Sequence, residues 1–241
     1  MRDRFTPGRL LLGGHRGNPA DHPENTLASF DSAIALGVDV IECDIHLTAD
    51  GRLAVIHDHT LARTTSGTGL VGRRTLAELK QLDAGGGERI PELVEVLELA
   101  RGKVGVAVEI KNLPVTYPGI EARLVEALRN ARMSRECAAI SFDHRSVKRV
   151  RELDQDVVGG VLVAGRPLML AEMLSWADAQ VYSPHWSFVD SETVAEVHGC
   201  GAVIGVWTVD DTDILERSRN LGVDAVYTNR PEEMLRLLAE A

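Results

Sequence analysis

The 241-residue chain is poor in cysteine and has no long apolar run. Its three cysteines, Cys43, Cys137 and Cys200, are scattered, odd in number and set in apolar segments. This pattern argues against a disulfide framework or a zinc site and predicts buried thiols in a reducing compartment. No run of eighteen apolar residues occurs, so neither a transmembrane helix nor stable membrane insertion is expected. Leu10–Leu12 is too short for a signal peptide, and the predicted location is the cytoplasm.

An excess of positive charge is also missing. The formal net charge is −10, which argues against a nucleic-acid partner and against docking on anionic lipid surfaces. Apolar residues make up 44% of the chain, enough for a substantial core. These properties predict a soluble globular protein.

The most informative segment is 38–46, VDVIECDIH, which predicts a buried β-strand. Alternate side chains of a strand share a face, so Glu42, Asp44 and His46 lie together on one side. Buried neighbouring carboxylates are costly unless a cation holds them, and Mg²⁺ or Ca²⁺ prefers carboxylate oxygens. The alternative is a solvent-facing acidic pair on an edge strand.

The flanking segments predict a β-α-β unit followed by a hairpin. Residues 9–17 predict a short apolar strand that ends in a Gly-rich, cationic turn. A helix capped by Asn25 or Thr26 then runs to Leu36, and Gly37 ends it. The Asp50-Gly51 pair predicts a hairpin turn after the second strand. If Ala49 pairs with Arg52, the register places His57 opposite Asp44.

Strand and helix patterns then alternate to the end of the chain. Further strands are predicted over 104–111, 137–142, 157–163, 180–183, 202–209 and 224–228. Eight parallel strands with intervening helices predict an α/β fold, the (β/α)8 TIM barrel. The alternative is an open doubly wound sheet, but no G-x-G-x-x-G follows the first strand. We expect one domain over 1–241, with a small insertion after the third strand-like segment at about 59–90.

Polar residues gather at the predicted carboxyl ends of these strands, where TIM barrels carry their chemistry. They are His15, Arg16, Glu42, Asp44, Glu109, Lys111, Ser141, Asp143, Ser183, His185, Trp207, Thr208, Asn229 and Arg230. Simpler interpretations exist: Glu109 and Lys111 as an ion pair, Trp207 as core, Asp143 as a helix cap. The convergence favours a site, because Glu42, Asp44 and Glu109 in one pocket require a cation. Arg16 and Lys111 would suit an anionic substrate.

The chain resembles the glycerophosphodiester phosphodiesterase family. Ordered blocks carry the resemblance: HRG at 15–17, PENT at 23–26, IECD at 41–44, DG at 50–51, HD at 57–58, LARTT at 61–65, TLAELKQLD at 75–83, IPEL at 90–93, EIK at 109–111, SF at 141–142, WTV at 207–209 and TNRP at 228–231. Two features depart from the family pattern, the Gly85–Gly87 run and Asp210 where asparagine is more common. Both are expected on substrate-facing loops, which leaves the identity of the leaving alcohol open.

The resemblance implies a role for each candidate residue. Glu42, Asp44 and Glu109 would bind one divalent metal, Mg or Ca, and His15 and His57 would be the acid-base pair. Arg16 and Lys111 would hold the phosphate, and Trp207 would line the glycerol side. The expected reaction is hydrolysis of glycerophosphodiesters, as small-molecule substrates, to sn-glycerol 3-phosphate and an alcohol. Two alternatives are a lysophospholipid-type phosphodiesterase using the same site and a non-catalytic barrel that binds phosphorylated ligands.

Overall fold

The computed structural model describes residues 1 and 8–240, and its centre is a closed parallel sheet. The strands are β1 (Leu11–Gly14), β2 (Val40–Leu47), β4 (Gly105–Ile110), β5 (Cys137–Ser141), β6 (Val158–Val163), β7 (Val181–Pro184), β8 (Val203–Val206) and β9 (Ala225–Thr228). Each pairs in parallel with the next, and β9 pairs with β1 to close the ring. The predicted eight-stranded TIM barrel is confirmed.

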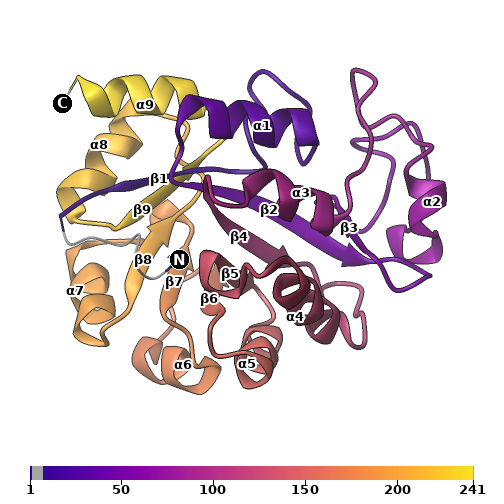
Figure 1. Cartoon of the computed structure of the whole chain (residues 1–241). Coiled ribbons are helices and arrows are strands. Elements are labelled where there is room, and N and C mark those ends of the chain that lie inside the picture. Colours follow the sequence, from indigo (N-terminus) through magenta and orange to yellow (C-terminus); the bar gives the residue numbers. More distant parts are fainter. Residues whose placement is uncertain (2–7, 241) are drawn as a thin grey trace.

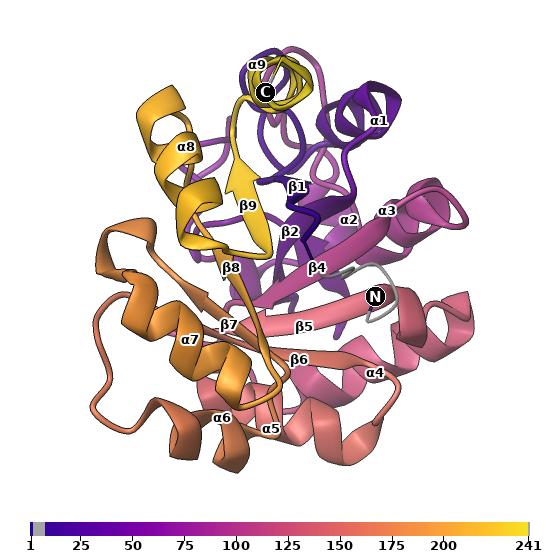
Figure 2. The ribbon, with the colours of Figure 1, turned by 90° about the vertical axis from the view of Figure 1, so that its left-hand side faces the viewer.

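Helices surround this barrel (Figures 1 and 2). They are α1 (Leu27–Leu36), α3 (Leu93–Ala100), α4 (Ile120–Ala131), α5 (His144–Leu153), α6 (Leu170–Ala177), α7 (Ser191–Gly199), α8 (Thr212–Leu221) and α9 (Pro231–Ala239), with 3₁₀ turns η3 (Ser134–Glu136) and η4 (Trp186–Phe188). Within the described residues, no helix has the length and apolar character needed to cross a membrane.

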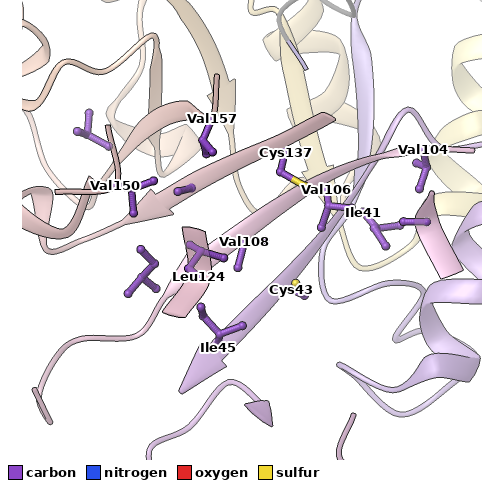
Figure 3. Close-up of a cluster of buried hydrophobic side chains, with 14 of the residues drawn as sticks. Ile41, Cys43, Ile45, Val104, Val106, Val108, Leu124, Cys137, Val150 and Val157 are labelled. Atoms are coloured by element: carbon purple, nitrogen blue, oxygen red, sulfur yellow. The ribbon is translucent and has the colours of Figure 1, made fainter. Parts of the chain in front are cut away.

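Alternation along β2 divides its side chains between two cores. Ile41, Cys43 and Ile45 face outward and pack with the helices, as Figure 3 shows. Val40 points into the barrel interior, in a second apolar cluster that includes Tyr227. The side chains of β2 that point inward are apolar at the start of the strand and acidic further along it. The face predicted to carry Glu42 and Asp44 therefore lines the barrel interior.

Local signals set the ends of α1 as predicted. Thr26 is the N-cap, since its side chain accepts a hydrogen bond from the Ser29 amide, and Gly37 ends the helix at φ 90°. The left-handed conformation at that position is one that glycine adopts without steric cost. The prediction for the cysteines is correct for Cys43 and Cys137 but wrong for Cys200, which is exposed at the end of α7.

The predicted hairpin register is wrong by one residue. The short strand β3 (Leu53–Val55) runs antiparallel to β2, but Thr48, not Ala49, pairs with Arg52, and the Ile56 amide binds the Asp44 carbonyl. The loop therefore has three residues and ends at Gly51 with φ 75°. The Thr48 hydroxyl stabilises it through bonds to Asp50 and Arg52. Consequently Ile56, not His57, lies opposite Asp44.

The segment predicted as an insertion contains only η2 (Val71–Arg73) and the single-turn helix α2 (Leu76–Leu79). It lies at the end of the barrel to which β2 and β4 point (Figure 1). A separate small core, which includes Leu61, Val71 and Leu79, packs beneath it. Its boundaries and the division of the chain into one domain stay predictions.

Candidate active site

A pocket opens at the carboxyl end of the barrel. Seven of the eight predicted site residues line it: His15, Arg16, Glu42, His57, Glu109, Lys111 and Trp207. The eighth, Asp44, is fully buried beside them. The structure thus brings the predicted set together from β2 and β4 and from the segments that follow β1, β3, β4 and β8.

Three buried carboxylates converge in this pocket. Glu42 and Asp44 share the inner face of β2, and Glu109 lies directly opposite Asp44 on β4. One oxygen from each lies within 4.8 Å of the others. Oε1 of Glu42 is buried without a hydrogen-bond partner, while its Oε2 accepts from the Arg16 amide. Oδ1 of Asp44 is also buried without a hydrogen bond, and its nearest cation is Lys111 Nζ at 3.0 Å. Buried carboxylate oxygens without hydrogen bonds fit a hard divalent cation.

Two cations partly balance these three charges. Lys111 Nζ lies 2.6 Å from Glu109 and 3.0 Å from Asp44, and Arg16 Nε lies 3.4 Å from Asp44. Burial opposes ionisation of Asp44, but Lys111 and Arg16 outweigh it and hold the pKa of Asp44 below its ordinary value. Burial raises the pKa of Glu109 to about 7, against the opposing charge of Lys111. The ion-pair interpretation of Glu109 and Lys111 is therefore correct as well.

Of the three carboxylates, Glu42 is the one whose negative charge the surrounding residues compensate least. Burial, with Asp44 and Glu109 nearby, raises the pKa of Glu42 well above its ordinary value. A carboxyl group that is disfavoured as an anion gains most from an added positive charge. The electrostatics of the cluster thus agree with its geometry in favouring a divalent cation.

His15 is held in one tautomer by a contact far away in the sequence. Its Nδ1 lies 2.8 Å from Oδ1 of Asn229, and Asn229 Nδ2 donates to Asp210. Because that amide group is oriented by Asp210, its oxygen faces His15 and must accept the Nδ1 proton. Nε2 is then left for the pocket, 4.0 Å from Glu42. Burial, with the charge of Arg16, lowers the pKa of His15 to about 4.

This arrangement corrects the expectation for Asp210. Its carboxylate also accepts bonds from the Asn229 amide and the Thr228 hydroxyl. Asp210 does lie on the loop after β8, whose Trp207 and Thr208 line the pocket, but its carboxylate faces Asn229 behind His15 and not the pocket. The sequence pointed to both partners, since Asn229 belongs to the TNRP block and Asp210 departs from the family pattern. Their contact was not predictable because it joins two separate segments.

His57 reaches the pocket from the segment after β3 and is held in the same way. Its Nδ1 lies 2.7 Å from a carboxylate oxygen of Asp58, which as an anion can only accept, so Nε2 is again free. Its backbone carbonyl accepts a bond from His46 Nε2 at 3.0 Å, and His46 Nδ1 meets the Tyr117 hydroxyl. Burial lowers the pKa of both His57 and His46. His46 had no predicted role, although it shares the acidic face of β2.

Asn25 also has a role that the sequence did not predict. It was a candidate helix cap, but its Nδ2 donates to Asp44 at 2.7 Å and its Oδ1 accepts from the Asp44 amide. Asn25 has φ 59°, a left-handed conformation that asparagine tolerates better than most residues. The PENT block thus supports a carboxylate of the site.

Trp207 forms an aromatic wall of the pocket, and its predicted place on the glycerol side stays a prediction. Its indole Nε1 donates to the Ser183 carbonyl at 2.9 Å. The Phe142 and His185 rings pack against it edge-on, with centroids 5.7 and 5.3 Å away. Of the simpler interpretations, Asp143 does cap α5, since its side chain accepts from the Arg145 amide.

Fold and site together define a barrel hydrolase with an acidic, histidine-containing pocket. The model of the glycerophosphoryl diester phosphodiesterase family matches residues 15–233. A glycerophosphodiester phosphodiesterase from Caldanaerobacter subterraneus subsp. tengcongensis is 38% identical, covering 95% of this chain and 98% of that protein. The one from Bacillus altitudinis is 35% identical over 94% and 97%.

Comparison with solved structures points to the same family. A phosphodiesterase from Oleispira antarctica, in complex with the product sn-glycerol-3-phosphate, has a TM-score of 0.88 and 30% identity, with 95% of this chain and 96% of that chain covered. A glycerophosphodiester phosphodiesterase from Agrobacterium tumefaciens has a TM-score of 0.81 and 29% identity, over 97% and 100%. The chain therefore belongs to the glycerophosphoryl diester phosphodiesterase family, and the predicted family and enzyme class are confirmed.

Proposed function

We propose that this protein is a metal-dependent phosphodiesterase that hydrolyses glycerophosphodiesters to sn-glycerol 3-phosphate and an alcohol by histidine acid-base catalysis. The observation that carries the proposal is the convergence of two imidazoles, each with Nε2 free, on a pocket of three carboxylates and two cations. Such a pocket has the groups that phosphodiester hydrolysis requires: proton donors and acceptors, and positive charge for the phosphate.

Glu42, Asp44 and Glu109 would hold one divalent cation, Mg or Ca. When bound, it would supply Lewis-acid polarisation of a phosphate oxygen. The donor set fits this role because all three side chains offer only oxygen atoms and are buried.

The two histidines would move the protons. One Nε2 takes the proton of the nucleophile as the nucleophile's oxygen bonds to phosphorus. Water as nucleophile gives sn-glycerol 3-phosphate directly, whereas the neighbouring glycerol hydroxyl gives a cyclic phosphodiester that a water molecule then opens. The other protonates the alkoxide released when the bond between phosphorus and the leaving oxygen breaks. Burial disfavours the charged imidazolium of His15 and His57, but an anionic diester in the pocket favours it. Substrate binding thus prepares one imidazole to act as the acid.

Arg16 and Lys111 would bind the phosphate. Each lies at the pocket wall and contacts a carboxylate, yet retains further N–H groups, since lysine has three donors and arginine five. Trp207 would pack against the glycerol carbons. We also propose a reducing, cytoplasmic location, supported by the free thiols of Cys43, Cys137 and Cys200.

The test is an assay of the purified full chain on soluble glycerophosphodiesters. The protein is stripped with a chelator and assayed with Mg²⁺, Ca²⁺ or Mn²⁺, and released sn-glycerol 3-phosphate is measured by a coupled reaction. We expect turnover only with a divalent ion. Equal rates in chelator, or no turnover with any diester and ion, would contradict the proposal.

A lysophospholipid-type activity is the second candidate, and one observation favours it. Large apolar side chains are exposed on the loops after β4, β5 and β6: Leu113, Phe142, Leu168 and Met169. These loops follow neighbouring parallel strands, so they lie at the same end of the barrel as the pocket, which Phe142 also lines. Lysophosphatidylcholine and glycerophosphocholine should be compared as substrates; hydrolysis of the soluble diester alone would exclude this candidate.

A further inference from the structure

One side chain of the 59–90 segment, Arg63, binds two carboxylates that each contact a residue of the candidate site. Arg63 makes two bonds to Asp58, at 2.7 and 3.1 Å, and two to Glu24, both at 2.8 Å. Its guanidinium therefore holds two carboxylates at once. Every other residue in these contacts comes from outside the segment.

Each carboxylate in turn holds a residue of the pocket. Asp58 accepts the Nδ1 proton of His57, and Glu24 accepts from Arg16 Nη1 at 3.0 Å. A continuous chain of contacts thus runs from His57 through Asp58, Arg63 and Glu24 to Arg16. It joins the proposed acid-base residue to the proposed phosphate-binding residue.

The chemistry of this junction requires arginine. A planar guanidinium presents a fixed fork of five N–H donors and can bind two carboxylates along two of its edges. A lysine ammonium is a point charge that cannot fix the planes of both. Hydrogen bonds from Arg63 hold the pKa of Asp58 well below its ordinary value, so Asp58 remains an anion that can only accept from His57.

The backbone around Arg63 is anchored independently of the pocket. Leu61 is buried in the small core under the segment, and its amide binds the Gly69 carbonyl at 3.0 Å. The Thr65 amide and hydroxyl both bind the Leu61 carbonyl. The guanidinium thus projects from a short, internally bonded loop.

We propose that Arg63 is a positioning residue for catalysis: it sets the tautomer and orientation of His57 through Asp58 and the position of Arg16 through Glu24. The inference rests on the proposed function for its kinetic consequences, but not for the tautomer. It also assigns a purpose to the 59–90 segment, which is to deliver this guanidinium to the edge of the site.

The kinetic test compares Arg63→Gln and Arg63→Lys with a matched control. Arg52 makes a similar two-pronged contact to Glu92, at 2.6 Å twice, and is comparably exposed, but it does not line the pocket. We expect Arg63→Gln to lower kcat about tenfold to a hundredfold and to raise KM, Arg63→Lys to recover part of the loss, and Arg52→Gln to change neither. In a His57→Ala background, Arg63→Gln should lower kcat no further but should still raise KM.

A purely structural role would give a different pattern. Arg63→Gln would then lower the melting temperature and reduce kcat by the same factor with or without His57, and the proposal would be wrong. Equal behaviour of Arg63→Gln and Arg52→Gln would overturn it as well.

The tautomer gives a readout that needs no activity. In protein carrying ¹⁵N-histidine, the imidazole NMR signals of His57, assigned by their loss in His57→Ala, should report a single Nδ1–H form in the wild type and in Arg52→Gln. In Arg63→Gln the Asp58 carboxylate loses the two bonds that fix its plane and can turn away from His57, so the signals should become a mixture of tautomers. An unchanged Nδ1–H form in Arg63→Gln would refute the positioning role even if the enzyme proves inactive on every diester.

Discussion

Arg16 combines an unusual backbone with a demanding set of contacts. It has φ 57°, its amide binds Glu42, and its guanidinium meets Glu24 and Asp44. Arg16 makes all of these contacts from its position in the turn that follows β1. In the proposed function, the site would use the shape of the guanidinium and not only its charge.

Replacing Arg16 with lysine tests this point. Arg16→Lys keeps the charge but loses the forked hydrogen bonding, so we expect kcat/KM to fall about tenfold to a hundredfold, the loss of one or two charge-assisted hydrogen bonds. The melting temperature should change little. Kinetics on a soluble glycerophosphodiester and thermal unfolding measure the two effects; unchanged kinetics would show that Arg16 is an ordinary turn residue.

The histidine pair allows the two proton-transfer roles to be separated. His15→Ala and His57→Ala should each reduce turnover of an unactivated diester by about 10²- to 10⁴-fold. A diester with a good leaving group needs no general acid, so it should restore activity in only one of the two variants. That variant identifies the acid. Near-normal rates of both variants on the unactivated diester would place the acid-base residues elsewhere.

An asparagine variant of Asp210 can show whether the support behind His15 matters. Asp210→Asn keeps the size of the side chain but gives it donors where Asn229 needs an acceptor, so the Asn229 amide can turn and present its nitrogen to His15. We expect turnover to fall about tenfold to a hundredfold, with little change in KM. Steady-state kinetics decide this, and full activity would mean that asparagine at this position holds Asn229 equally well.

The elements show which features follow from local sequence. Strand β2, the caps of α1 and the acidic face were predictable because alternation and capping depend on neighbouring residues. The hairpin register was not, because side-chain bonds of Thr48 select a three-residue loop that the Asp-Gly pair does not reveal. His57 nevertheless reaches the pocket, since the Ile56 amide and His46 fix the backbone on either side of it.

The same distinction holds for the candidate site. The residues that line the pocket stand at strand ends, where the barrel rule places them, so their convergence was predictable. The residues that orient them were not. Asn229 is 214 positions from His15, and Arg63 is 39 from Glu24 within a segment that has little regular structure. Such contacts depend on how loops fold over the barrel, which no periodic pattern encodes.

Gly51 tests the loop directly. Its φ of 75° favours glycine, and a Cβ added at this position would approach only the Arg123 guanidinium, at 3.9 Å. Gly51→Ala should therefore cost about 1 kcal/mol of unfolding free energy through backbone strain alone, and Gly51→Asn should cost less. Urea unfolding measures both, with diester hydrolysis expected to stay unchanged. Equal stability of the alanine variant and the wild type would mean that the loop adopts another conformation.

For the molecule as a whole, the acidic cluster should couple metal binding to stability. Burying Glu42, Asp44 and Glu109 together beneath one pocket opposes folding unless positive charge compensates it, and Lys111 and Arg16 do so only in part. A divalent ion bound only by the folded chain, at a hundred times its dissociation constant, adds about 2.7 kcal/mol. In a protein of this size that corresponds to a rise in melting temperature of roughly 5 to 10 °C.

This rise is measurable without any substrate. Chelator-treated protein should melt at the lower temperature, and Mg²⁺ or Ca²⁺ should restore the difference in a saturable, concentration-dependent manner. Glu109→Gln removes one charged ligand and keeps the shape, so its melting temperature in chelator should stay close to or above that of the wild type, while its response to the ion should be largely lost. Glu126→Gln, on the exposed face of α4, is the control and should respond like the wild type. If wild type and Glu109→Gln respond equally to the ion, the cation binds elsewhere and the three carboxylates serve only as partners of Lys111 and Arg16.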